Sequence, residues 1–340
     1  MAAILGGGDT AGYARVEGPR PFVFPDDHGP HPQHRSEWWY CTGNLEGEGG
    51  RRFGYQLTFF RASAAPGAPE RASAWATNQV YMAHLALTDV AGRSFHHHER
   101  LARGAAGLAG ASARPFAVWL EDWRLDAEAL EPLTLRLRAR EGGTALDLRL
   151  VATKPIVPQG ERGFSQKGPE PGNASHYYSS TRMASTGHVE AGGVRHAVRG
   201  ASWLDREWGT SALGEGIAGW DWFALQLDDG RELMFYRLRR ADGGMAPHSK
   251  GSLVAADGSV RVLRAMDVGL EELGRWSSPH SGATYPGRWR VRVPDAGLEL
   301  ELEPVLADQE LRVALRYWEG AVDVRGTAAG RGYVELTGYR

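Results

Sequence analysis

Short stretches in which hydrophobic and polar residues alternate recur along most of the chain. In the first half they lie at residues 38–45, 52–61, 79–89, 133–138 and 144–153. Alternation with a period of two is typical of β-strands that are buried on one face. Most of these stretches are bounded by Gly, Pro, Asn or Asp, which favour turns. The pattern therefore predicts a β protein whose body begins near Ser36.

The second half repeats this pattern. Its candidate strands lie at residues 220–227, 232–239, 252–255, 260–265, 288–293, 298–304, 311–316, 321–325 and 332–337. Asp-Gly pairs at 229–230, 242–243 and 257–258 predict hairpin turns, because glycine tolerates a positive φ. No stretch keeps the 3.6-residue period of a helix. Many short strands with regular turns predict an all-β barrel or sandwich rather than an α/β fold.

The length of 340 residues suits two domains of roughly 150 residues each. Residues 1–35 carry Gly, Pro and His without periodicity and are predicted to form an extended lead-in. A Gly-Gly turn near 192–199 suggests a boundary, which gives an N-terminal domain at 36–195 and a C-terminal domain at 196–340. Residues 62–74, rich in Ala, Pro and Gly, are predicted to form a flexible loop.

Charge and composition disfavour several kinds of binding partner and bear on where the protein is located. The net charge is −2 and the basic residues are scattered singly, which disfavours nucleic acid and anionic membranes as partners. No stretch approaches the roughly 18 apolar residues of a transmembrane helix. Residues 1–8 lack the charged and apolar regions of a signal peptide. We expect a cytoplasmic protein, or a periplasmic one if a signal peptide has been removed.

Motifs that suggest a cofactor or a nucleophile lack the context they need. Residues 214–219 match the dinucleotide pattern G-x-G-x-x-G, but they precede a Trp-rich strand instead of opening a helix. Residues 163–168 resemble a nucleophile elbow whose glycine spacing is off by one, which disfavours a serine hydrolase. The only cysteine, Cys41, excludes an intrachain disulfide and a thiolate zinc site.

Histidines form two groups, His28, His31 and His34 in the lead-in and His96, His97 and His98 further on. Neither group belongs to an H-E-x-x-H pattern, and consecutive residues of a strand point to opposite faces. We interpret both groups as solvated residues, and we expect no metal ion.

Acidic residues stand beside tryptophans in three segments, at residues 36–40, 203–209 and 219–223. In a strand, Glu37 and Trp39 point to one face, and Trp38 and Tyr40 point to the other. A carboxylate rarely enters an apolar interior unless it is paired or protonated. The acids of these segments therefore either form a buried network with arginines that joins the two halves or serve as tuned acids. The arginines available for such pairing are Arg35, Arg61, Arg182 and Arg206.

Taken in order, these segments resemble the lipocalin-like family that joins the AttH proteins to the carotenoid 1,2-hydratases. The resemblance runs from about residue 20 to the end and rests on residues 34–40, 53–61, 166–168, 177–182, 203–209, 219–223, 317–322 and 332–339. It implies two lipocalin-like β-barrel or sandwich domains packed together, with a ligand pocket within or between them. It also implies water addition to acyclic carotenoids in the hydratase branch and cyclisation in related fungal proteins. The AttH branch, which the chain resembles more closely, is often described as a hydrolase.

One departure from the family concerns a residue of the hydratase motif. The hydratase branch carries Asp-His-x-Trp-Gly where this chain has Asp-Arg-Glu-Trp-Gly at residues 205–209. Arginine cannot donate a proton at ordinary pH, so Arg206 is not the acid. The candidate catalytic acids are Asp205, Glu207 and Asp221.

We therefore expect acid-initiated hydration or cyclisation of a hydrophobic isoprenoid or polyene, without a cofactor. A desolvated carboxylic acid would protonate an alkene, and aromatic faces would stabilise the resulting cation. The expected substrate-binding residues are Glu37, Trp39, Arg182, Trp208, Trp220, Trp222 and Tyr236. Two alternatives remain open, a carrier of a lipophilic molecule that is linked to an exporter and a hydrolase.

Overall fold

The computed structural model describes residues 10–67, 72–210 and 213–340, and its regular structure is almost entirely β-strand. The helices in this part of the chain are four single 3₁₀ turns, η1 (Asp26–His28), η2 (Glu48–Gly50), η3 (Ala265–Asp267) and η4 (Pro294–Ala296). None of the helices in the described ranges is long and apolar enough to cross a membrane. The predicted all-β fold is confirmed.

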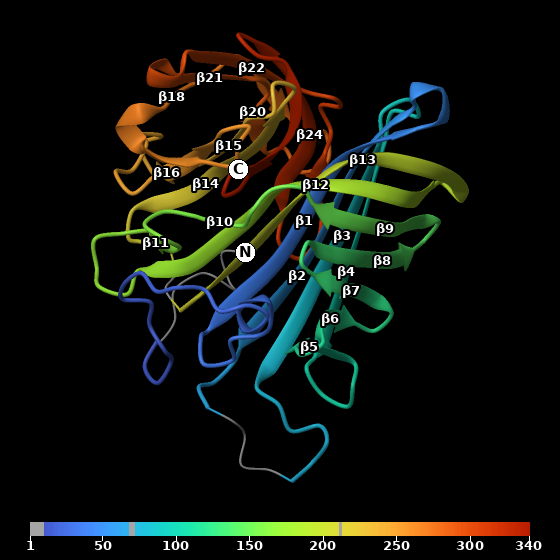
Figure 1. Cartoon of the computed structure of the whole chain (residues 1–340), viewed down its shortest axis with the longest axis vertical. Coiled ribbons are helices and arrows are strands. Elements are labelled where there is room, and N and C mark those ends of the chain that lie inside the picture. The colour runs from blue at the N-terminus through green and yellow to red at the C-terminus, as the bar shows by residue number, and fades with distance from the viewer. Residues whose placement is uncertain (1–9, 68–71, 211–212) are drawn as a thin grey trace.

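The first sheet contains 13 strands from the N-terminal part of the chain (Figure 1). These strands are β1 (Ser36–Gly47), β2 (Arg52–Ser63), β3 (Gln79–Asp89), β4 (Ser94–Arg103), β5 (Ala109–Ala113), β6 (Phe116–Leu120), β7 (Trp123–Leu130), β8 (Leu133–Glu141), β9 (Thr144–Ala152), β10 (Val157–Pro158), β11 (Phe164–Gln166), β12 (Ala174–Ala191) and β13 (Val194–Gly209). The main path has the order β4-β3-β2-β1-β13-β12-β9-β8-β7-β6-β5, and β10 and β11 pair with β12.

The second sheet contains ten strands. These strands are β14 (Ile217–Leu227), β15 (Glu232–Arg240), β16 (Lys250–Val254), β17 (Val260–Arg264), β18 (Gly269–Glu272), β21 (Trp289–Val293), β22 (Leu298–Pro304), β23 (Glu310–Leu311), β24 (Tyr317–Gly326) and β25 (Gly330–Leu336). Its main path has the order β17-β16-β15-β14-β25-β24-β22-β21-β18, and β23 pairs with β24. A separate two-stranded sheet joins β19 (Arg275–Ser277) to β20 (Thr284–Pro286).

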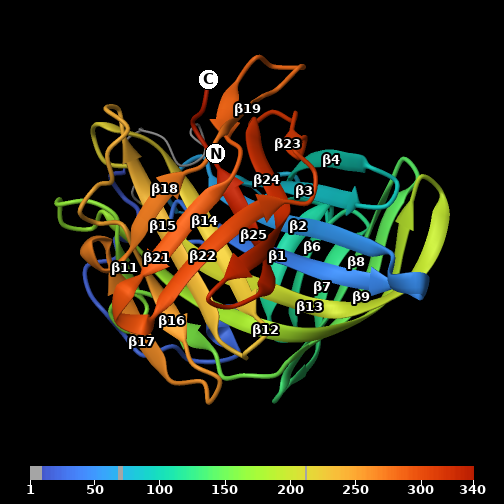
Figure 2. The same ribbon diagram turned by 90° about the horizontal axis from the view of Figure 1, so that it is seen from above.

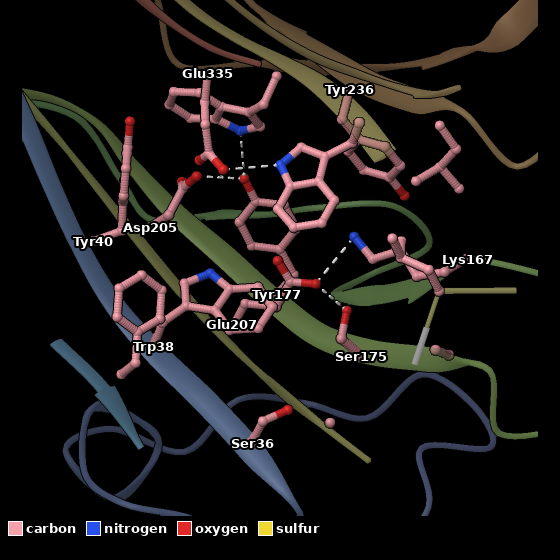
Figure 3. Close-up of a pocket in the computed structure, with 17 residues that line it drawn as sticks. Ser36, Trp38, Tyr40, Lys167, Ser175, Tyr177, Asp205, Glu207, Tyr236 and Glu335 are labelled. Atoms are coloured by element: carbon pink, nitrogen blue, oxygen red, sulfur yellow. Dashed lines mark hydrogen bonds and ion pairs between the residues drawn. The ribbon is translucent and has the colours of Figure 1, made fainter. Parts of the chain in front are cut away.

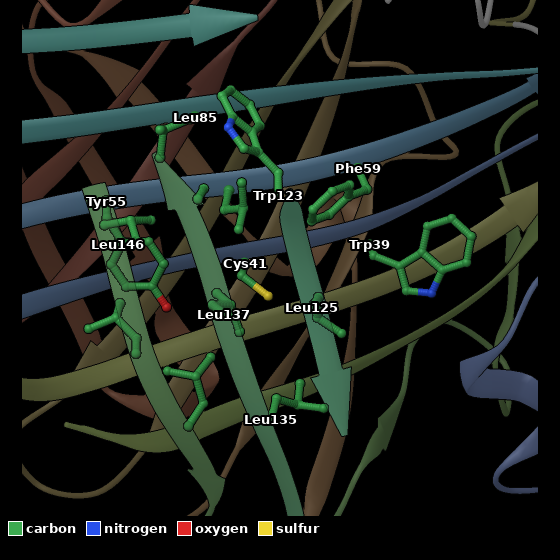
Figure 4. Packing of buried hydrophobic residues seen from close by; sticks show 14 of the residues in the cluster. Trp39, Cys41, Tyr55, Phe59, Leu85, Trp123, Leu125, Leu135, Leu137 and Leu146 are labelled. Atoms are coloured by element: carbon green, nitrogen blue, oxygen red, sulfur yellow. The ribbon is translucent and has the colours of Figure 1, made fainter. Parts of the chain in front are cut away.

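Each large sheet curls around its own apolar core. In the first sheet, β1 to β3 face β6 to β9 across a core that includes Trp39, Leu85, Trp123 and Leu137 (Figure 4). The second sheet encloses another core, of which Phe223 and Trp289 are members. The two curled sheets lie side by side in both overall views (Figures 1 and 2). The expectation of two barrel-like units packed together is confirmed.

The two sheets pack through the outer face of β1, β12 and β13. Because side chains alternate along a strand, β1 sends Trp39 and Cys41 into the first core and Tyr40 to the outer face. Tyr40 meets Tyr177, Trp203 and Trp222 in an aromatic cluster between the sheets. Tyr40, Tyr177 and Trp222 of this cluster also line a pocket between the sheets.

The sheets change later in the sequence than the predicted boundary at 195/196. The turn at Gly192 and Gly193 joins β12 to β13 in one long hairpin, and residues 198–209 of β13 also pair with β1. The chain therefore enters the second sheet only after Gly209. Neither β12 nor β13 was predicted, because long strands with many Ser, Thr and Gly residues show little alternation.

Two of the predicted hairpin turns are confirmed, and one predicted strand is wrong. The turns at 228–230 and 257–258 join β14 to β15 and β16 to β17, with Gly230 and Gly258 at φ values of 85° and 86°. The strand predicted at 311–316 is wrong, because only Glu310 and Leu311 pair with β24. Within the loop predicted at 62–74, residues 68–71 lie outside the described part of the chain, as do residues 1–9.

The prediction that the lead-in histidines are solvated is wrong. His28, His31 and His34 are only 2%, 7% and 6% exposed, because the lead-in folds back over the first sheet. The ring of His31 stacks on Trp208 with centroids 3.9 Å apart, and the Nδ1 atom of His28 lies 2.6 Å from the Tyr178 hydroxyl. Burial lowers the pKa of His28 and of His34 to about 4, so both rings are neutral at pH 7. The lead-in is therefore part of the packed structure.

Candidate functional site

A pocket lies between the two sheets (Figure 3). About 910 Å³ of space between atoms lies in and in front of this pocket, including space that is open to solvent. Aromatic and aliphatic side chains form most of the wall, and a few charged groups point into it, which is the usual character of a small-molecule site. The lining residues are Ser36, Trp38, Tyr40, Phe60, Lys167, Ala174, Ser175, Tyr177, Asp205, Glu207, Gly209, Leu213, Trp220, Trp222, Tyr236, Leu238 and Glu335.

The wall from the first sheet is set by strand alternation on β1 and β13. These strands pair so that Tyr40 lies opposite Asp205 and Trp38 lies opposite Glu207. All four side chains line the pocket. The residues between them, such as Arg206, point to the other face of the sheet.

The wall from the second sheet contains a row of residues that are successive cross-strand partners. Tyr236 on β15 lies opposite Trp222 on β14, and Trp222 lies opposite Glu335 on β25. Beyond the pocket wall, the same row continues to Lys250 on β16 at one end and to Glu319 on β24 at the other. Neighbouring strands are about 4.8 Å apart, so Tyr236 and Glu335 are separated by roughly 10 Å.

Asp205 is a buried carboxyl group that accepts three hydrogen bonds. Its Oδ1 atom accepts from the Ser179 hydroxyl at 2.5 Å and from the Trp203 indole at 2.6 Å. Its Oδ2 atom accepts from the Tyr177 hydroxyl at 2.5 Å. Burial raises the pKa of Asp205 to about 7 although these donors favour the ionised form. Both protonation states of Asp205 are therefore populated near neutral pH.

Glu335 is a second buried acid in the pocket, and sequence reasoning missed it. Its side chain accepts one hydrogen bond, from the Trp220 indole at 3.1 Å. Burial raises the pKa of Glu335 to about 8, so this carboxyl is mostly protonated at pH 7. The available signal was alternation on β25, where Val334 and Leu336 enter the apolar core and Glu335 is on the opposite face.

Glu319 lies behind Glu335 and outside the pocket wall. Its Oε1 atom accepts a hydrogen bond from the Tyr40 hydroxyl at 2.5 Å. Its Oε2 atom is buried and has no hydrogen-bond partner among the described residues. Burial, followed by the nearby Glu335, raises the pKa of Glu319 well above its ordinary value. Glu319 and Glu335 therefore form a buried pair that holds protons at neutral pH.

The other side of the pocket carries an ion pair (Figure 3). The Nζ atom of Lys167 lies 3.0 Å from Oε1 of Glu207, which also accepts a hydrogen bond from Ser175. The same ammonium group lies 4.0 Å from the ring centroid of Tyr236. Burial alone would lower the pKa of Lys167, but the Glu207 carboxylate holds it above its ordinary value. Lys167 is therefore a fixed cation in the pocket.

Five of the ten residues predicted for the site line this pocket. They are Asp205, Glu207, Trp220, Trp222 and Tyr236. Asp221 is on the opposite face of β14, where its carboxylate is 2.5 Å from Nε of Arg237 and 3.3 Å from Nη1 of Arg239. This arrangement makes Asp221 part of a buried ion-pair network.

The remaining predicted residues lie away from the pocket wall. Glu37 forms buried ion pairs with Arg61 and Arg206. Trp39 and Trp208 are on the same side of the first sheet and enclose Arg206, whose guanidinium carbon is 4.1 Å and 4.9 Å from their rings.

Arg182 bridges the sheets, because its Nε atom lies 2.5 Å from Glu232 on β15. Glu232 is not one of the acids of the three predicted segments. Glu37 pairs with Arg61 and Arg206 within the first sheet rather than across the two sheets. No group of His, Cys, Asp and Glu side chains within the described ranges could hold a metal ion.

This chain is similar in sequence and in structure to known proteins. A family model described as AttH-like matches residues 15–339. The crystal structure of a putative AttH from Nitrosomonas europaea is 36% identical in sequence, with 96% of this chain and 100% of that chain covered and a TM-score of 0.85. No match was found among curated proteins.

Two more distant structures share the fold. Kievitone hydratase from Nectria haematococca is 15% identical, with 96% of each chain covered and a TM-score of 0.69. CghA in complex with Sch210972 is 13% identical, with 97% of each chain covered and a TM-score of 0.55. At these identities the similarity establishes the common fold alone.

Proposed function

The chain belongs to the AttH-like family, and we propose that it catalyses acid-initiated hydration or cyclisation of an alkene in a hydrophobic isoprenoid or polyene. One observation carries this proposal. Glu335 is a largely protonated carboxylic acid in a pocket walled by tryptophan and tyrosine rings. A proton donor surrounded by aromatic faces is what formation of a carbocation requires.

Glu335 is the proton donor in this mechanism. Its O–H bond breaks as a C–H bond forms at one alkene carbon, which leaves a carbocation on the other carbon and a carboxylate on Glu335. Glu335 accepts a hydrogen bond from Trp220, and its carboxyl group lines the pocket in which a substrate would lie. Asp205 is less suited to this step, because three donors stabilise its ionised form.

Aromatic rings stabilise the cation. Trp222 is next to Glu335 in the cross-strand row, and Tyr236 follows it. The faces of both rings carry the negative part of the aromatic quadrupole and attract a positive charge, most strongly where water is excluded.

Asp205 completes the reaction as the base. In its ionised form it accepts a proton from a water molecule whose oxygen bonds to the cation, so the net change is the addition of water to the double bond. Exchange with solvent then returns the proton from Asp205 and reprotonates Glu335. If a second double bond of the substrate attacks the cation first, a ring forms and the positive charge moves to a carbon of that second double bond. Asp205 then removes a proton from the neighbouring carbon to give a cyclised isomer, or accepts a proton from the water that adds to the cation.

The name of one distant structural relative is consistent with this chemistry. Kievitone hydratase shares the two-sheet fold, and its name describes water addition. Its low sequence identity gives no residue assignment for this chain. The proposal therefore rests on the groups in the pocket.

A carrier of a lipophilic molecule, such as one that serves an exporter, is the second candidate function. The observation in its favour is that the polar groups of the pocket already satisfy one another, as in the Lys167–Glu207 and Tyr177–Asp205 contacts. Hydrolysis has less support, because the Ser165 hydroxyl contacts the Tyr236 hydroxyl rather than a general base.

Turnover in heavy-oxygen water tests the proposal. The purified protein is incubated with myrcene, geraniol, farnesol and an acyclic carotenoid, and bound and released molecules are analysed by mass spectrometry. We expect a product that contains heavy oxygen, or a cyclised isomer. Glu335→Gln should abolish its formation, and Asp205→Asn should reduce hydration by about 10²-fold or more.

The matched control is Glu303→Gln on β22, which removes a carboxylate from the exposed face of the same sheet as Glu335. It should leave turnover unchanged. Full activity of Glu335→Gln would remove this residue from the mechanism. Recovery of only unchanged ligand from the wild-type protein would favour the carrier.

A further inference from the structure

The two sides of the pocket differ in chemistry. Glu335 and Asp205 lie on one side, and Lys167, Glu207 and Ser175 lie on the other (Figure 3). The cross-strand row separates them, because Trp222 stands between Tyr236, which Lys167 covers, and Glu335. The hydration mechanism uses the acid side and assigns no role to the ion pair.

The ion pair is held in place by several contacts. Lys167 follows β11 and is fixed by Glu207 at 3.0 Å and by the Tyr236 ring at 4.0 Å. Ser175 donates a hydrogen bond to the same carboxylate. An ammonium group has three N–H donors and an ionised carboxylate has two acceptor oxygens, so the pair can bind further polar atoms.

A hydroxyl group fits this pair better than other head groups. Its oxygen accepts from the Lys167 ammonium while its O–H donates to the Glu207 carboxylate. A ligand carboxylate would lie against the negative charge of Glu207, which is unfavourable. A hydrocarbon would exclude water from both charges and offer no hydrogen bond in return.

We propose that Lys167 and Glu207 form a head-group subsite for the hydroxyl group of an isoprenoid alcohol whose reacting double bond lies beside Glu335. This inference rests on the proposed function only for the identity of the reacting acid. It names the substrate class as an oxygenated isoprenoid rather than a pure hydrocarbon. The roughly 10 Å between Tyr236 and Glu335 requires the double bond to lie at a distance from the hydroxyl group.

Equilibrium binding of matched probes tests the subsite. Quenching of tryptophan fluorescence reports binding of geraniol and of myrcene, which have similar carbon skeletons and differ in the hydroxyl group. Geranic acid provides the carboxylate analogue. We expect geraniol to be favoured over myrcene and over geranic acid in the wild-type protein.

The key comparison uses a double variant, Lys167→Met with Glu207→Met. Replacing both partners avoids an unpaired buried charge and preserves the fold. The geraniol-to-myrcene affinity ratio should fall by about 10- to 100-fold, the effect of hydrogen bonds to charged groups. Comparing this ratio between proteins cancels the different solubilities of the probes.

Lys250→Met is the matched control, because Lys250 is partly buried on the neighbouring strand and does not line the pocket. Lys250→Met should preserve the geraniol-to-myrcene affinity ratio.

Three outcomes would overturn the subsite. They are an unchanged ratio in the double variant, tighter binding of geranic acid than of geraniol, and no binding of any probe. Selective alcohol binding without a heavy-oxygen product would overturn the hydration mechanism alone, and a product with an unchanged ratio would overturn the subsite alone.

Discussion

Glu335 and Glu319 are direct cross-strand partners on β25 and β24, and both carboxyl groups are buried, at 7% and 1% exposure. Two ionised carboxylates side by side in this environment would repel each other and lose hydration. Burial therefore raises the pKa of each, and the pair is mostly neutral at pH 7. The pairing of β24 with β25 therefore places two protonated carboxyl groups side by side, one in the pocket wall and one behind it.

The first prediction concerns the pH dependence of stability. The pKa of Glu335 rises from 4.5 to about 8 on folding, so its contribution is fully present below pH 4.5 and is lost as the pH rises through about 8. Glu335→Gln removes this loss. Relative to the wild type, the unfolding free energy of the variant in urea should be higher at pH 9 than at pH 5 by about 4 kcal/mol. A difference that is the same at both pH values would contradict the assignment.

The second prediction concerns the hydrogen bond between Tyr40 and Glu319. Tyr40→Phe removes the hydrogen bond of 2.5 Å that the Oε1 atom of buried Glu319 accepts, and should cost about 1–3 kcal/mol of unfolding free energy. Glu319→Gln keeps an acceptor for Tyr40 and should cost less. Chemical denaturation of both variants at pH 7 measures the difference, and an equal loss would argue against a protonated Glu319.

The third prediction concerns the ion pairs around Glu37. Glu37→Gln leaves Arg61 and Arg206 buried without their carboxylate partner, which should cost about 3–5 kcal/mol. Glu46→Gln on the same strand is the control, because Glu46 is exposed. Ligand binding by the folded fraction should be preserved, because Glu37 is on the face of β1 opposite the pocket. Loss of binding in fully folded protein would place Glu37 in the site instead.

The fourth prediction tests the packing between the sheets at Gly54 on β2. A Cβ atom at this position would lie 2.6 Å from the Tyr333 hydroxyl and 2.8 Å from Cβ of Ala321, which belong to the second sheet. Gly54→Ala should therefore destabilise the protein by about 1–3 kcal/mol through overpacking. Gly18→Ala is the control, because a Cβ atom at Gly18 would meet open space. Gly49 also has open space but adopts a positive φ, which would strain an alanine there. Equal stability of Gly54→Ala and Gly18→Ala would contradict the close approach of the sheets.

Local sequence patterns predicted which side chains share a face. The period of two separates Tyr40 from Trp39 on β1, and the structure has the same division. Asp205 and Arg206 are divided in the same way on β13, although that strand was not predicted. Trp220 and Trp222 are two residues apart on β14, and both line the pocket for the same reason. Alternation is a property of the extended backbone itself and needs no tertiary information.

The sequence by itself determined the all-β fold, the faces of the strands and the aromatic and acidic character of the site. Only the tertiary structure decided which face meets the pocket, where Asp205 and Glu335 come together from different sheets. It also decided that Asp221 meets Arg237 and that Lys167 enters the site from a loop. The physical reason is that burial and pairing of a charge depend on contacts between residues far apart in the sequence, which a local pattern does not contain.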